Sequence, residues 1–330
     1  MLGLFLHIRH WLYDKQILPS HKVSVPTICI GNIAVGGTGK TPHTEYLIRM
    51  LSPMYKVAVL SRGYKRKTCG FVMADHTSTA ATIGDEPMQI HRKFPDITVA
   101  VCENRVRGVH QLQRMVPDLQ VVLLDDAMQH RSLQCGFTVL LTALDNLYIT
   151  DRLMPWGRLR DLKQRSLAAQ AVIVTKCPAD MKPIDQRVIN NRLRLPAYQQ
   201  LYFSHIVYEP IEVTGSNPLV ISGIAHPEAF YAYIREQFPK ASFLTFEDHH
   251  RFTKADERKI EAISAAHDCI LTTEKDYERL LLTRLPDSVK QKIQAVPIRV
   301  DLDKQNDDLK RQLTAYINED LKHLQKNKKA

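Results

Sequence analysis

The sequence predicts an α/β protein with a mostly parallel sheet covered by helices on both faces, joined by a short β ribbon to a second, smaller α/β domain. Three observations lead to this prediction. With 330 residues, the chain has the length of about two domains. Short β-branched runs alternate with longer segments of helical periodicity, and the runs are almost continuously apolar, as in parallel strands buried on both faces. After Pro218 the same alternation resumes on a smaller scale.

The first domain, expected over residues 21–200, contains the longer alternation. Its expected strands are 23–30, 56–60, 97–101, 121–124, 137–141 and 171–174. Its clearest expected helices lie between these strands, at 43–51, 88–94 and 105–115. Alternation of this kind is typical of a sheet whose strands run parallel.

Residues 201–216 are expected to form a two-stranded linker. Two extended, aromatic-rich pieces, 200–208 and 211–213, are separated by Pro210. In the second domain, 217–330, we expect strands at 219–224, 242–246, 269–272 and 296–300, and helices at 228–237 and 254–266. The lysine-rich tail 319–330 is expected to be a solvated helix end.

The composition excludes several classes of protein. Apolar residues make up 44% and charged residues 24%, as in soluble globular proteins. The six cysteines form no C-x-x-C pair, so neither a zinc site nor a disulfide framework is indicated, and a reducing compartment is favoured. The net charge is +10, but the basic clusters lack the interleaved aromatic residues of base-stacking proteins. We therefore expect no nucleic acid partner, and we interpret the charge as suited to anionic lipid or a phosphorylated sugar.

Residues 1–20 predict a separate amphipathic helix. Leu4, Ile8 and Trp11 fall on one helical face. The apolar run over residues 1–6 is far shorter than the roughly 20 residues needed to span a bilayer. The residues alone leave two alternatives open, an interfacial helix with Trp11 at headgroup depth or a first helix packed on its own domain.

A glycine-rich turn follows the first expected strand. It ends in Gly39-Lys40-Thr41 and opens a helix, as in the P-loop pattern G-x-x-x-x-G-K-[ST], although Ala34 stands at the position of the first glycine. Lys40 would reach the β- and γ-phosphates, and the Thr41 hydroxyl would ligate Mg²⁺. The large sheet is therefore expected to be P-loop NTPase-like. The predicted nucleotide cradle consists of Gly36, Gly37, Thr38, Gly39, Lys40 and Thr41.

A strand that ends in two acidic residues is the second motif typical of nucleotide binding. Residues 121–126 read Val-Val-Leu-Leu-Asp-Asp, a buried strand whose carboxyl end carries Asp125 and Asp126. Ligands of open α/β sheets gather at the carboxyl ends of the strands, where Lys40 is also expected. The pattern is typical of a metal-binding Walker B strand. Because side chains alternate along a strand, only one of the two acids is expected to face the metal directly.

Further motifs follow in a fixed order along the chain. They are Gly31-Asn32-x3-Gly36-Gly37-Thr38-Gly39-Lys40-Thr41-Pro42, Ser61-Arg62-Gly63-Tyr64, Gly84-Asp85-Glu86-Pro87, Asp125-Asp126-x-x-Gln129-His130-Arg131, Pro155-x-Gly157-Arg158-Leu159-Arg160, Val174-Thr175-Lys176-Cys177-Pro178, Asp248-His249 and Thr273-Glu274-Lys275-Asp276. Together they resemble the tetraacyldisaccharide 4'-kinase (lipid A 4'-kinase) family, from the first helix to about residue 276. The family commonly shows Asp-Asp-Gly-Phe-Gln where this chain has Ala127 and Met128 in place of the Gly and the Phe. Alanine is small like glycine, and methionine is apolar like phenylalanine.

The resemblance implies a reaction and a place in the cell. The reaction is ATP-dependent phosphorylation of the 4'-hydroxyl of an acylated glucosamine disaccharide 1-phosphate in lipid A biosynthesis, by direct in-line transfer with ATP and Mg²⁺. The implied location is the cytoplasmic face of the bacterial inner membrane, as a peripheral or monotopic protein. The helix within residues 1–20 is then expected to contact the membrane surface.

The resemblance also implies a base dyad for the sugar hydroxyl. Asp85 is similar to the family's catalytic aspartate and His249 to its partner, which would orient the carboxylate and share the proton. From the residues alone, Asp85-Glu86-Pro87 also fits a helix N-cap, with Pro87 at the first helical position. His249 and His250 likewise fit a pair of exposed loop histidines.

The remaining expected site residues bind metal or anionic groups. Glu86 is expected to hold Mg²⁺ together with Thr41 and one of the two strand-end acids. Arg158 and Arg160 lie in a Pro/Gly loop, and because a guanidinium fork suits phosphate oxygens, we assign Arg158 to the transferring group. To the acceptor we assign Arg62, Tyr64, Gln129 and Arg160.

The main alternative is a P-loop GTPase or metallochaperone-type NTPase. Residues 174–178 superficially resemble the guanine-reading N-K-x-D strand end. However, Pro178 stands where an Asp is needed, and its side chain cannot accept hydrogen bonds from guanine N–H groups. The GTP interpretation is therefore weakened.

Overall fold

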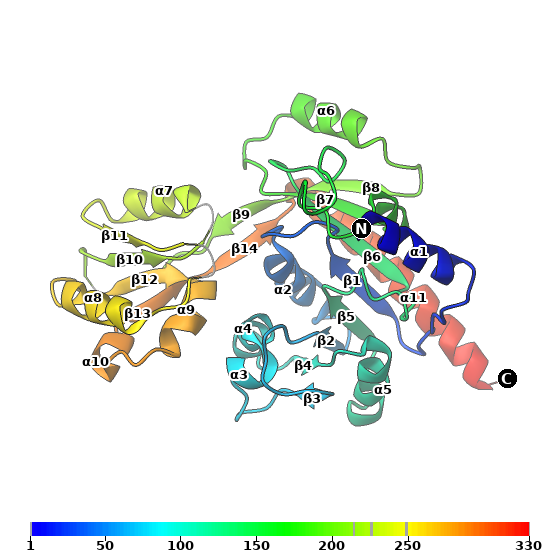
Figure 1. The fold of residues 1–330 in the computed structure, drawn as a ribbon, viewed down its shortest axis with the longest axis horizontal. Coiled ribbons are helices and arrows are strands. Elements are labelled where there is room, and N and C mark those ends of the chain that lie inside the picture. Colours follow the sequence, from blue (N-terminus) through cyan, green and yellow to red (C-terminus); the bar gives the residue numbers. More distant parts are fainter. Residues whose placement is uncertain (1, 214, 225–226, 248–249, 330) are drawn as a thin grey trace. The chain divides into compact units, whose positions relative to one another are not determined.

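An eight-stranded sheet forms the centre of the larger of two units in the computed structural model (Figure 1), which describes residues 2–213, 215–224, 227–247 and 250–329. Its order is β3-β4-β2-β5-β1-β6-β7-β8, and all neighbouring strands are parallel except β3 and β4 at one edge. The strands are β1 Thr27–Gly31, β2 Val57–Ser61, β3 Val72–Met73, β4 Thr98–Val101, β5 Val121–Asp125, β6 Phe137–Ala143, β7 Ala171–Thr175 and β8 Gln200–Phe203. The prediction of a mostly parallel sheet is confirmed.

Two apolar cores cover the two faces of this sheet. Every residue of β1, β2, β5, β6 and β7 is buried, which is why these strands lack a polar alternation. One core includes side chains from α2 (Lys40–Leu51), α4 (Asp85–Lys93) and α11 (Asn306–Lys329). The other includes α5 (Arg105–Met115) and α6 (Pro183–Leu193). The remaining helices of this unit are α1 Leu2–Asp14, α3 Ala80–Ile83 and the 3₁₀ helices Lys163–Ala168 and Asp303–Gln305.

The last helix, α11, belongs to the larger unit, which combines Met1–Ile206 with Val300–Ala330. We expected residues 217–330 to form one domain with a solvated tail, and the structure differs here. Leu309, Leu313 and Ile317 recur every fourth residue and are fully buried in the core on the α2 side of the large sheet. This packing brings the chain back to the first unit.

The smaller unit, Val207–Arg299, is built on a four-stranded parallel sheet of order β11-β10-β12-β13. α7 packs on one face of this sheet, while α8, α9 and α10 contribute to the core on the other. These elements are β10 Leu219–Ser222, α7 Glu228–Gln237, β11 Ser242–Thr245, α8 Lys254–Ser264, β12 Ile270–Thr273, α9 Glu274–Leu281, α10 Asp287–Lys290 and β13 Ile293–Val296. The predicted second α/β fold is present, without residues 300–330.

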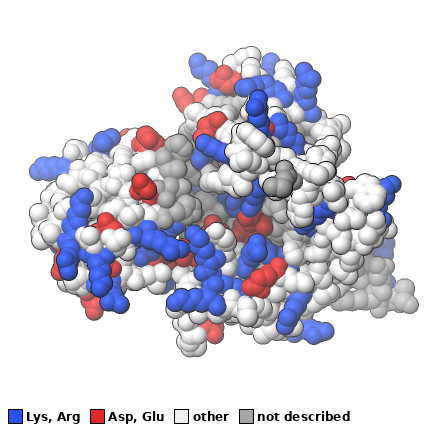
Figure 2. All heavy atoms as spheres, viewed as in Figure 1, with Lys and Arg blue, Asp and Glu red and all other residues white. Residues whose placement is uncertain are grey.

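The connection between the units differs from the expected linker. β8 belongs to the large sheet, and β9 (His205–Tyr208) pairs with β14 (Ile298–Asp301), so the two strands of the ribbon come from distant parts of the sequence. The expected strand 296–300 is divided at Pro297 into β13 and β14, because proline has no N–H to donate to a ladder. Figure 2 shows Lys and Arg side chains spread over the whole of the face that is drawn, with Asp and Glu side chains among them.

Candidate functional site

The glycine-rich turn connects the carboxyl end of β1 to the first residue of α2. β1 ends at Gly31 and α2 begins at Lys40, so the expected strand–turn–helix order is present. Gly36 and Gly39 have φ values of 108° and 84°, the left-handed region that glycine adopts without strain. The N–H groups of the first helical turn have no partner within the helix and favour an anion at this position. The turn can therefore hold phosphate.

Three buried polar side chains, to which the sequence assigned no role, hold this turn in place. The Asn32 amide donates to the Thr38 hydroxyl at 2.6 Å, and the Thr175 hydroxyl donates to the Thr38 carbonyl at 3.0 Å. His43 contacts the Gly39 carbonyl through Nδ1 at 2.7 Å and the Ser204 hydroxyl through Nε2 at 2.9 Å. Burial lowers the pKa of His43 to about 4, so the ring is neutral at pH 7.

Local sequence pattern carries only a partial signal for these contacts. Asn32 stands in the Gly31-Asn32 motif, but Ser204 and Thr175 approach the turn from β8 and β7 through the sheet. Their position depends on strand order, which local pattern does not contain.

Asp125 and Asp126 lie at the carboxyl end of β5 and have different surroundings. Asp125 is buried and accepts hydrogen bonds from Ser61 at 3.2 Å and Thr44 at 3.4 Å. Burial, together with the charges of Glu86 and Asp126, raises the pKa of Asp125 to about 7. The buried acid is therefore adjacent to two further carboxylates.

Asp126 faces the basic residues of the site. Its φ of 50° turns the chain out of the strand, and its carboxylate forms an ion pair with Lys40 at 4.0 Å and accepts hydrogen bonds from Arg160. Burial opposes ionisation, but the Arg160 hydrogen bond and the charges of Lys40, Arg160 and Arg105 hold the pKa of Asp126 below its usual value. The two acids therefore differ in protonation as well as in direction.

The donors present fit a Mg²⁺ ion that is bound together with a nucleotide. Within the described ranges, no group of three or more His, Cys, Asp and Glu side chains is arranged to hold a metal ion by itself. Mg²⁺ characteristically takes only one or two protein carboxylates, with phosphate oxygens and water completing its octahedron. Asp125 at the strand end, Thr41 in the first turn of α2 and the neighbouring charge of Glu86 supply oxygen donors of this kind.

Asp85 is the first residue of α4, and a tight backbone contact brings the Arg62–Tyr64 loop close to it. Gly84 has a φ of 96°, and a Cβ there would lie 3.2 Å from the Tyr64 carbonyl oxygen. A Cβ on Gly63 would lie 2.9 Å from the carbonyl oxygen of Ile83. Asp85 is exposed, as are Arg62 and Tyr64. A helix does begin at this motif, but the expected N-cap with Pro87 at the first helical position is wrong, because Gly84 is the N-cap and Asp85 the first helical residue.

A buried ion pair ties the helix of Asp85 to the helix of Lys40. Glu45 in α2 is buried, and its carboxylate lies 2.7 Å from the Lys93 ammonium of α4 and accepts from the Gln89 amide at 2.7 Å. Breaking a buried pair of this kind is costly, so the two helix starts are held in a fixed relation.

The loop of Arg158 and Arg160 hydrogen-bonds to the residues that precede the glycine-rich turn. Val35 N–H donates to the Arg158 carbonyl at 2.7 Å, and Arg160 N–H donates to the Ile33 carbonyl at 2.9 Å. The Arg160 guanidinium reaches Asn32 Oδ1 at 2.6 Å in addition to Asp126. The Arg158 side chain is exposed. Both arginines are thus held beside the turn.

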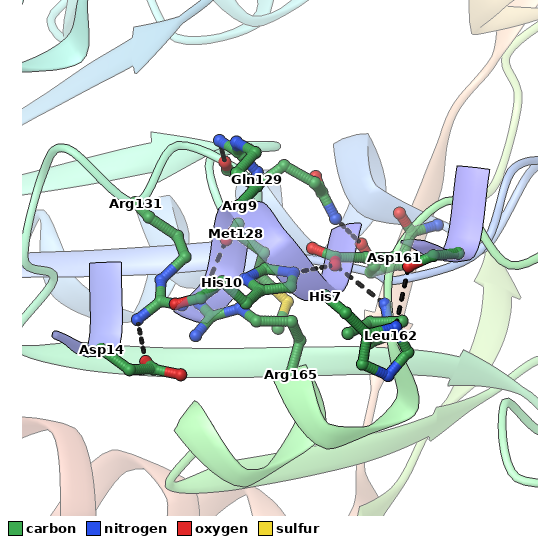
Figure 3. Close-up of polar contacts among 12 residues, drawn as sticks. His7, Arg9, His10, Asp14, Met128, Gln129, Arg131, Asp161, Leu162 and Arg165 are labelled. Atoms are coloured by element: carbon green, nitrogen blue, oxygen red, sulfur yellow. Dashed lines mark hydrogen bonds and ion pairs between the residues drawn. The ribbon is translucent and has the colours of Figure 1, made fainter. Parts of the chain in front are cut away.

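Gln129 and the first helix meet on the same side of the site (Figure 3). The Gln129 amide donates to the Asn32 carbonyl at 2.8 Å, and the Arg9 guanidinium donates to the Gln129 carbonyl at 2.7 Å. His10 contacts the fully buried carboxylate of Asp161 at 2.6 Å. The polar side of α1 therefore packs inward.

The apolar side of α1 faces outward. Leu4, Phe5, Ile8 and Trp11 are each more than half exposed, whereas Leu6 is buried. No helix in the described part of the chain is both long enough and apolar enough to cross a bilayer. Of the two alternatives for residues 1–20, the structure shows a first helix packed on its own domain, through its polar side and Leu6, while a membrane contact of the exposed apolar side stays a prediction.

His249, the expected partner of Asp85, lies outside the described residues, as does Asp248. Of the expected site residues, Lys40, Asp125, Asp126 and Arg160 come together with the glycine-rich turn at one sheet edge.

Comparison with known proteins identifies relatives over nearly the whole chain. The family model described as LpxK, tetraacyldisaccharide-1-P 4'-kinase, matches residues 1–318. A tetraacyldisaccharide 4'-kinase of Bacteroides thetaiotaomicron is 42% identical, covering 97% of this chain and 92% of its own length. One of Flavobacterium johnsoniae is 44% identical over 86% of each chain. The crystal structure of LpxK from Aquifex aeolicus in complex with ATP superposes with a TM-score of 0.73, at 25% identity and 96% coverage of both chains.

Proposed function

Since the chain belongs to the tetraacyldisaccharide-1-P 4'-kinase family, we propose that it transfers the γ-phosphoryl group of ATP in line to the 4'-hydroxyl of an acylated glucosamine disaccharide 1-phosphate. The chain is an ATP-binding phosphotransferase of lipid A biosynthesis. The acceptor is inferred from the name that its relatives carry, and the residue roles are inferred from the geometry of the site.

One observation supports this function above the others. Lys40 and Arg160 both reach Asp126 at the carboxyl edge of β1 and β5, beside a glycine-rich turn that opens a helix. This combination of two cations, a phosphate-binding turn and strand-end carboxylates is what in-line phosphoryl transfer requires, since its catalysis consists mainly of positioning and charge stabilisation.

The nucleotide is held by Gly36, Gly37, Thr38 and Gly39 through their backbone, while Lys40 contacts the β- and γ-phosphates. Thr41, Asp125 and Glu86 would hold Mg²⁺, which would neutralise negative charge on the phosphates. Arg158 stabilises the transferring group with its guanidinium. The acceptor is bound by Arg62, Tyr64, Gln129 and Arg160.

Asp85 accepts the proton of the 4'-hydroxyl. Its carboxylate is exposed at the start of α4, and the buried Glu45–Lys93 pair fixes that helix against the helix of Lys40. For His249, which would share the proton with Asp85, the support is the family resemblance alone.

Binding at the cytoplasmic face of the inner membrane is proposed for the exposed side of α1. A helix with Phe5 and Trp11 exposed resembles an interfacial element, which places its aromatic side chains at headgroup depth. A lipid acceptor would be reached from this side.

The test is transfer of ³²P from γ-labelled ATP to the acylated disaccharide 1-phosphate. Asp85→Asn should retain ATP affinity and lower kcat by about 10²- to 10⁴-fold, the usual contribution of a general base. Lys40→Ala should raise the KM for ATP and lower kcat by about 10²- to 10³-fold, because it removes a cation positioned at the developing charge.

Two exposed residues supply matched controls in the same unit. Asp96→Asn and Lys56→Ala change the same side-chain types at exposed positions and should leave both kinetic constants unchanged. Label that never reaches the glycolipid would overturn the acceptor assignment, and full turnover by Asp85→Asn would overturn the role of Asp85.

A further inference from the structure

Trp156 is the most exposed of the large apolar side chains in the described part of the chain. It is 80% exposed, and Met154, two residues earlier, is also exposed. Single exposed apolar residues are common and need no explanation. Trp156, however, stands at the tip of a loop whose backbone is extensively hydrogen-bonded, so its exposure is fixed by the structure of the loop.

The loop is closed by the Asp151 side chain and by its own backbone. One carboxylate oxygen of Asp151 accepts from the N–H groups of Arg152 at 2.7 Å and Arg158 at 3.1 Å. Leu159 N–H donates to the Arg152 carbonyl at 2.9 Å. A Cβ on Gly157 would lie 2.3 Å from that same carbonyl oxygen, so only glycine fits the turn. The two ends of the loop are thereby joined and the indole is directed outward.

The loop lies against the first helix. The position of a Cβ on Gly3 is 3.4 Å from Leu153 Cδ1, an ordinary packing distance. α1 exposes Leu4, Phe5, Ile8 and Trp11, and the loop adds two more apolar side chains. We name these six residues the outer apolar surface: Leu4, Phe5, Ile8, Trp11, Met154 and Trp156. Two elements separated by about 140 residues of sequence thus lie next to each other, and both expose large apolar side chains.

We propose that Trp156 inserts into the same bilayer interface as α1, as a second membrane contact. The inference rests on the proposed binding of α1 to a membrane and extends it to the loop. Tryptophan favours the headgroup level, where its ring is buried and its N–H stays hydrated. The exposed Arg152, four residues before Trp156, is placed to meet anionic headgroups.

A contact at the tip acts on the nucleotide site through the base of the loop. Arg158 and Arg160 are hydrogen-bonded to Val35 and Ile33, which lead into the glycine-rich turn. Insertion of Trp156 therefore holds the phosphate-binding turn close to the headgroup layer. In that position the sugar hydroxyl of a lipid acceptor can meet the γ-phosphate while its acyl chains stay in the bilayer.

The chain contains only two tryptophans, Trp11 in α1 and Trp156 in the loop. Trp11→Phe leaves Trp156 as the only indole, and Trp156→Phe leaves Trp11. Each full-length variant is mixed with vesicles of phosphatidylethanolamine and phosphatidylglycerol, with and without brominated acyl chains, in the absence of acceptor. We expect a blue shift of the emission and quenching by the brominated lipid in both variants.

The outcomes separate this inference from the proposed membrane contact of α1. If Trp11 is quenched and Trp156 is not, the second contact is excluded and the α1 contact stands. If neither is quenched, both are excluded. If Trp156 alone is quenched, the loop inserts and the role of α1 is excluded.

Activity on lipid presented in vesicles gives a second readout. Trp156→Ala should weaken vesicle association about tenfold, since roughly half of the indole's transfer free energy is lost, and should raise the KM for the lipid acceptor while leaving the KM for ATP unchanged. Ile184→Ala removes a similarly exposed apolar side chain from α6 and should change neither the vesicle affinity nor the KM for the lipid acceptor. Vesicle affinity equal to that of the unsubstituted chain would overturn the inference, and thermal unfolding of both variants verifies that they fold.

Discussion

The first and last helices, α1 and α11, are both amphipathic and both pack on the larger unit, but they direct opposite sides toward it. α11 buries Leu309, Leu313 and Ile317 in the core and leaves its charged side in water. α1 leaves its apolar side exposed and buries His10. Helical periodicity indicates that a helix has two different sides, and the comparison teaches that it does not indicate which of them faces the protein.

The difference lies in the kind of contact that each helix makes. α11 is held mainly by apolar packing, and tyrosine hydroxyls add polar contacts around that core. Tyr316 contacts the backbone of Thr27 at 3.1 and 3.2 Å, and Tyr46, Tyr55 and Tyr202 donate to Asn306, Asn318 and Gln312 of this helix. α1 is held by directional polar contacts, since Arg131 donates to the His10 ring at 3.0 Å and to the Asp14 carboxylate at 2.7 Å (Figure 3). A buried carboxylate such as Asp161 needs its partner, and this requirement orients the helix.

The largest expected effect on the free energy of unfolding is at the buried residues of α11. Leu313→Ala should lower the free energy of unfolding by about 2–5 kcal/mol, because it leaves a cavity against the sheet. Urea denaturation measures the loss. Lys310→Ala, at an exposed position one turn earlier, is the control and should remain within about 0.5 kcal/mol of the unsubstituted chain. A small loss for Leu313→Ala would mean that α11 is not part of this core.

An intermediate effect is expected at the polar contact of α1. His10→Ala leaves the buried Asp161 carboxylate without its ring partner and should cost about 1–3 kcal/mol. His10→Gln keeps a donor of similar reach and should restore part of the loss. Equal losses for the two variants would argue that the ring contributes by packing alone.

The same contact makes stability depend on pH. Arg131 can only donate, so Nδ1 of His10 accepts and Nε2–H donates to Asp161, which requires the neutral ring. Burial, reinforced by the charges of Arg165 and Arg131, lowers the pKa of His10 below its ordinary 6.5 despite Asp161. The unfolded chain therefore binds this proton more readily, and the contribution of His10, complete above pH 6.5, declines as the pH falls below it. Unfolding curves at pH 7 and pH 5 should show a larger loss for the unsubstituted chain than for His10→Gln, and equal losses would contradict the neutral ring.

The smallest effect on stability is expected at the exposed side of α1. Phe5→Ala should change the free energy of unfolding by no more than about 0.5 kcal/mol, because the ring is mostly exposed. Its neighbour Leu6 is buried, and Leu6→Ala should cost about 2 kcal/mol or more. A loss at Phe5 as large as that at Leu6 would show that the outward side of α1 is covered in solution.

Much of the larger unit could be predicted from local pattern. The strand before the glycine-rich turn, the helix that begins near Lys40 and the strand that ends in Asp125 each lie within a few residues of the expected bounds, because apolar runs and glycine positions determine them locally. The roles of Asp85, Arg158 and the acceptor-binding residues stay predictions, because they depend on bound substrate.

What could not be predicted depends on contacts between distant residues. His43 holds the turn through Ser204, which lies 161 residues away, and α11 returns to the sheet after the whole smaller unit. Only the tail 319–330 is predicted, as a lysine-rich, solvated helix end, because the buried positions Leu309, Leu313 and Ile317 of α11 are few among many charged ones. Neither the order of strands in a sheet nor the return of a late helix to an early sheet produces a periodic pattern in the sequence.

The position of α11 bears on how the protein is synthesised. The smaller unit, Val207–Arg299, is one continuous stretch, so all its residues are synthesised before α11 is made. The sheet face that α11 covers, lined by Ile28, Ile30 and Val139, stays uncovered until then. The nascent chain therefore exposes an apolar sheet face while nearly a third of the protein is translated. This face is where a chaperone, or a second unfolded chain, would bind.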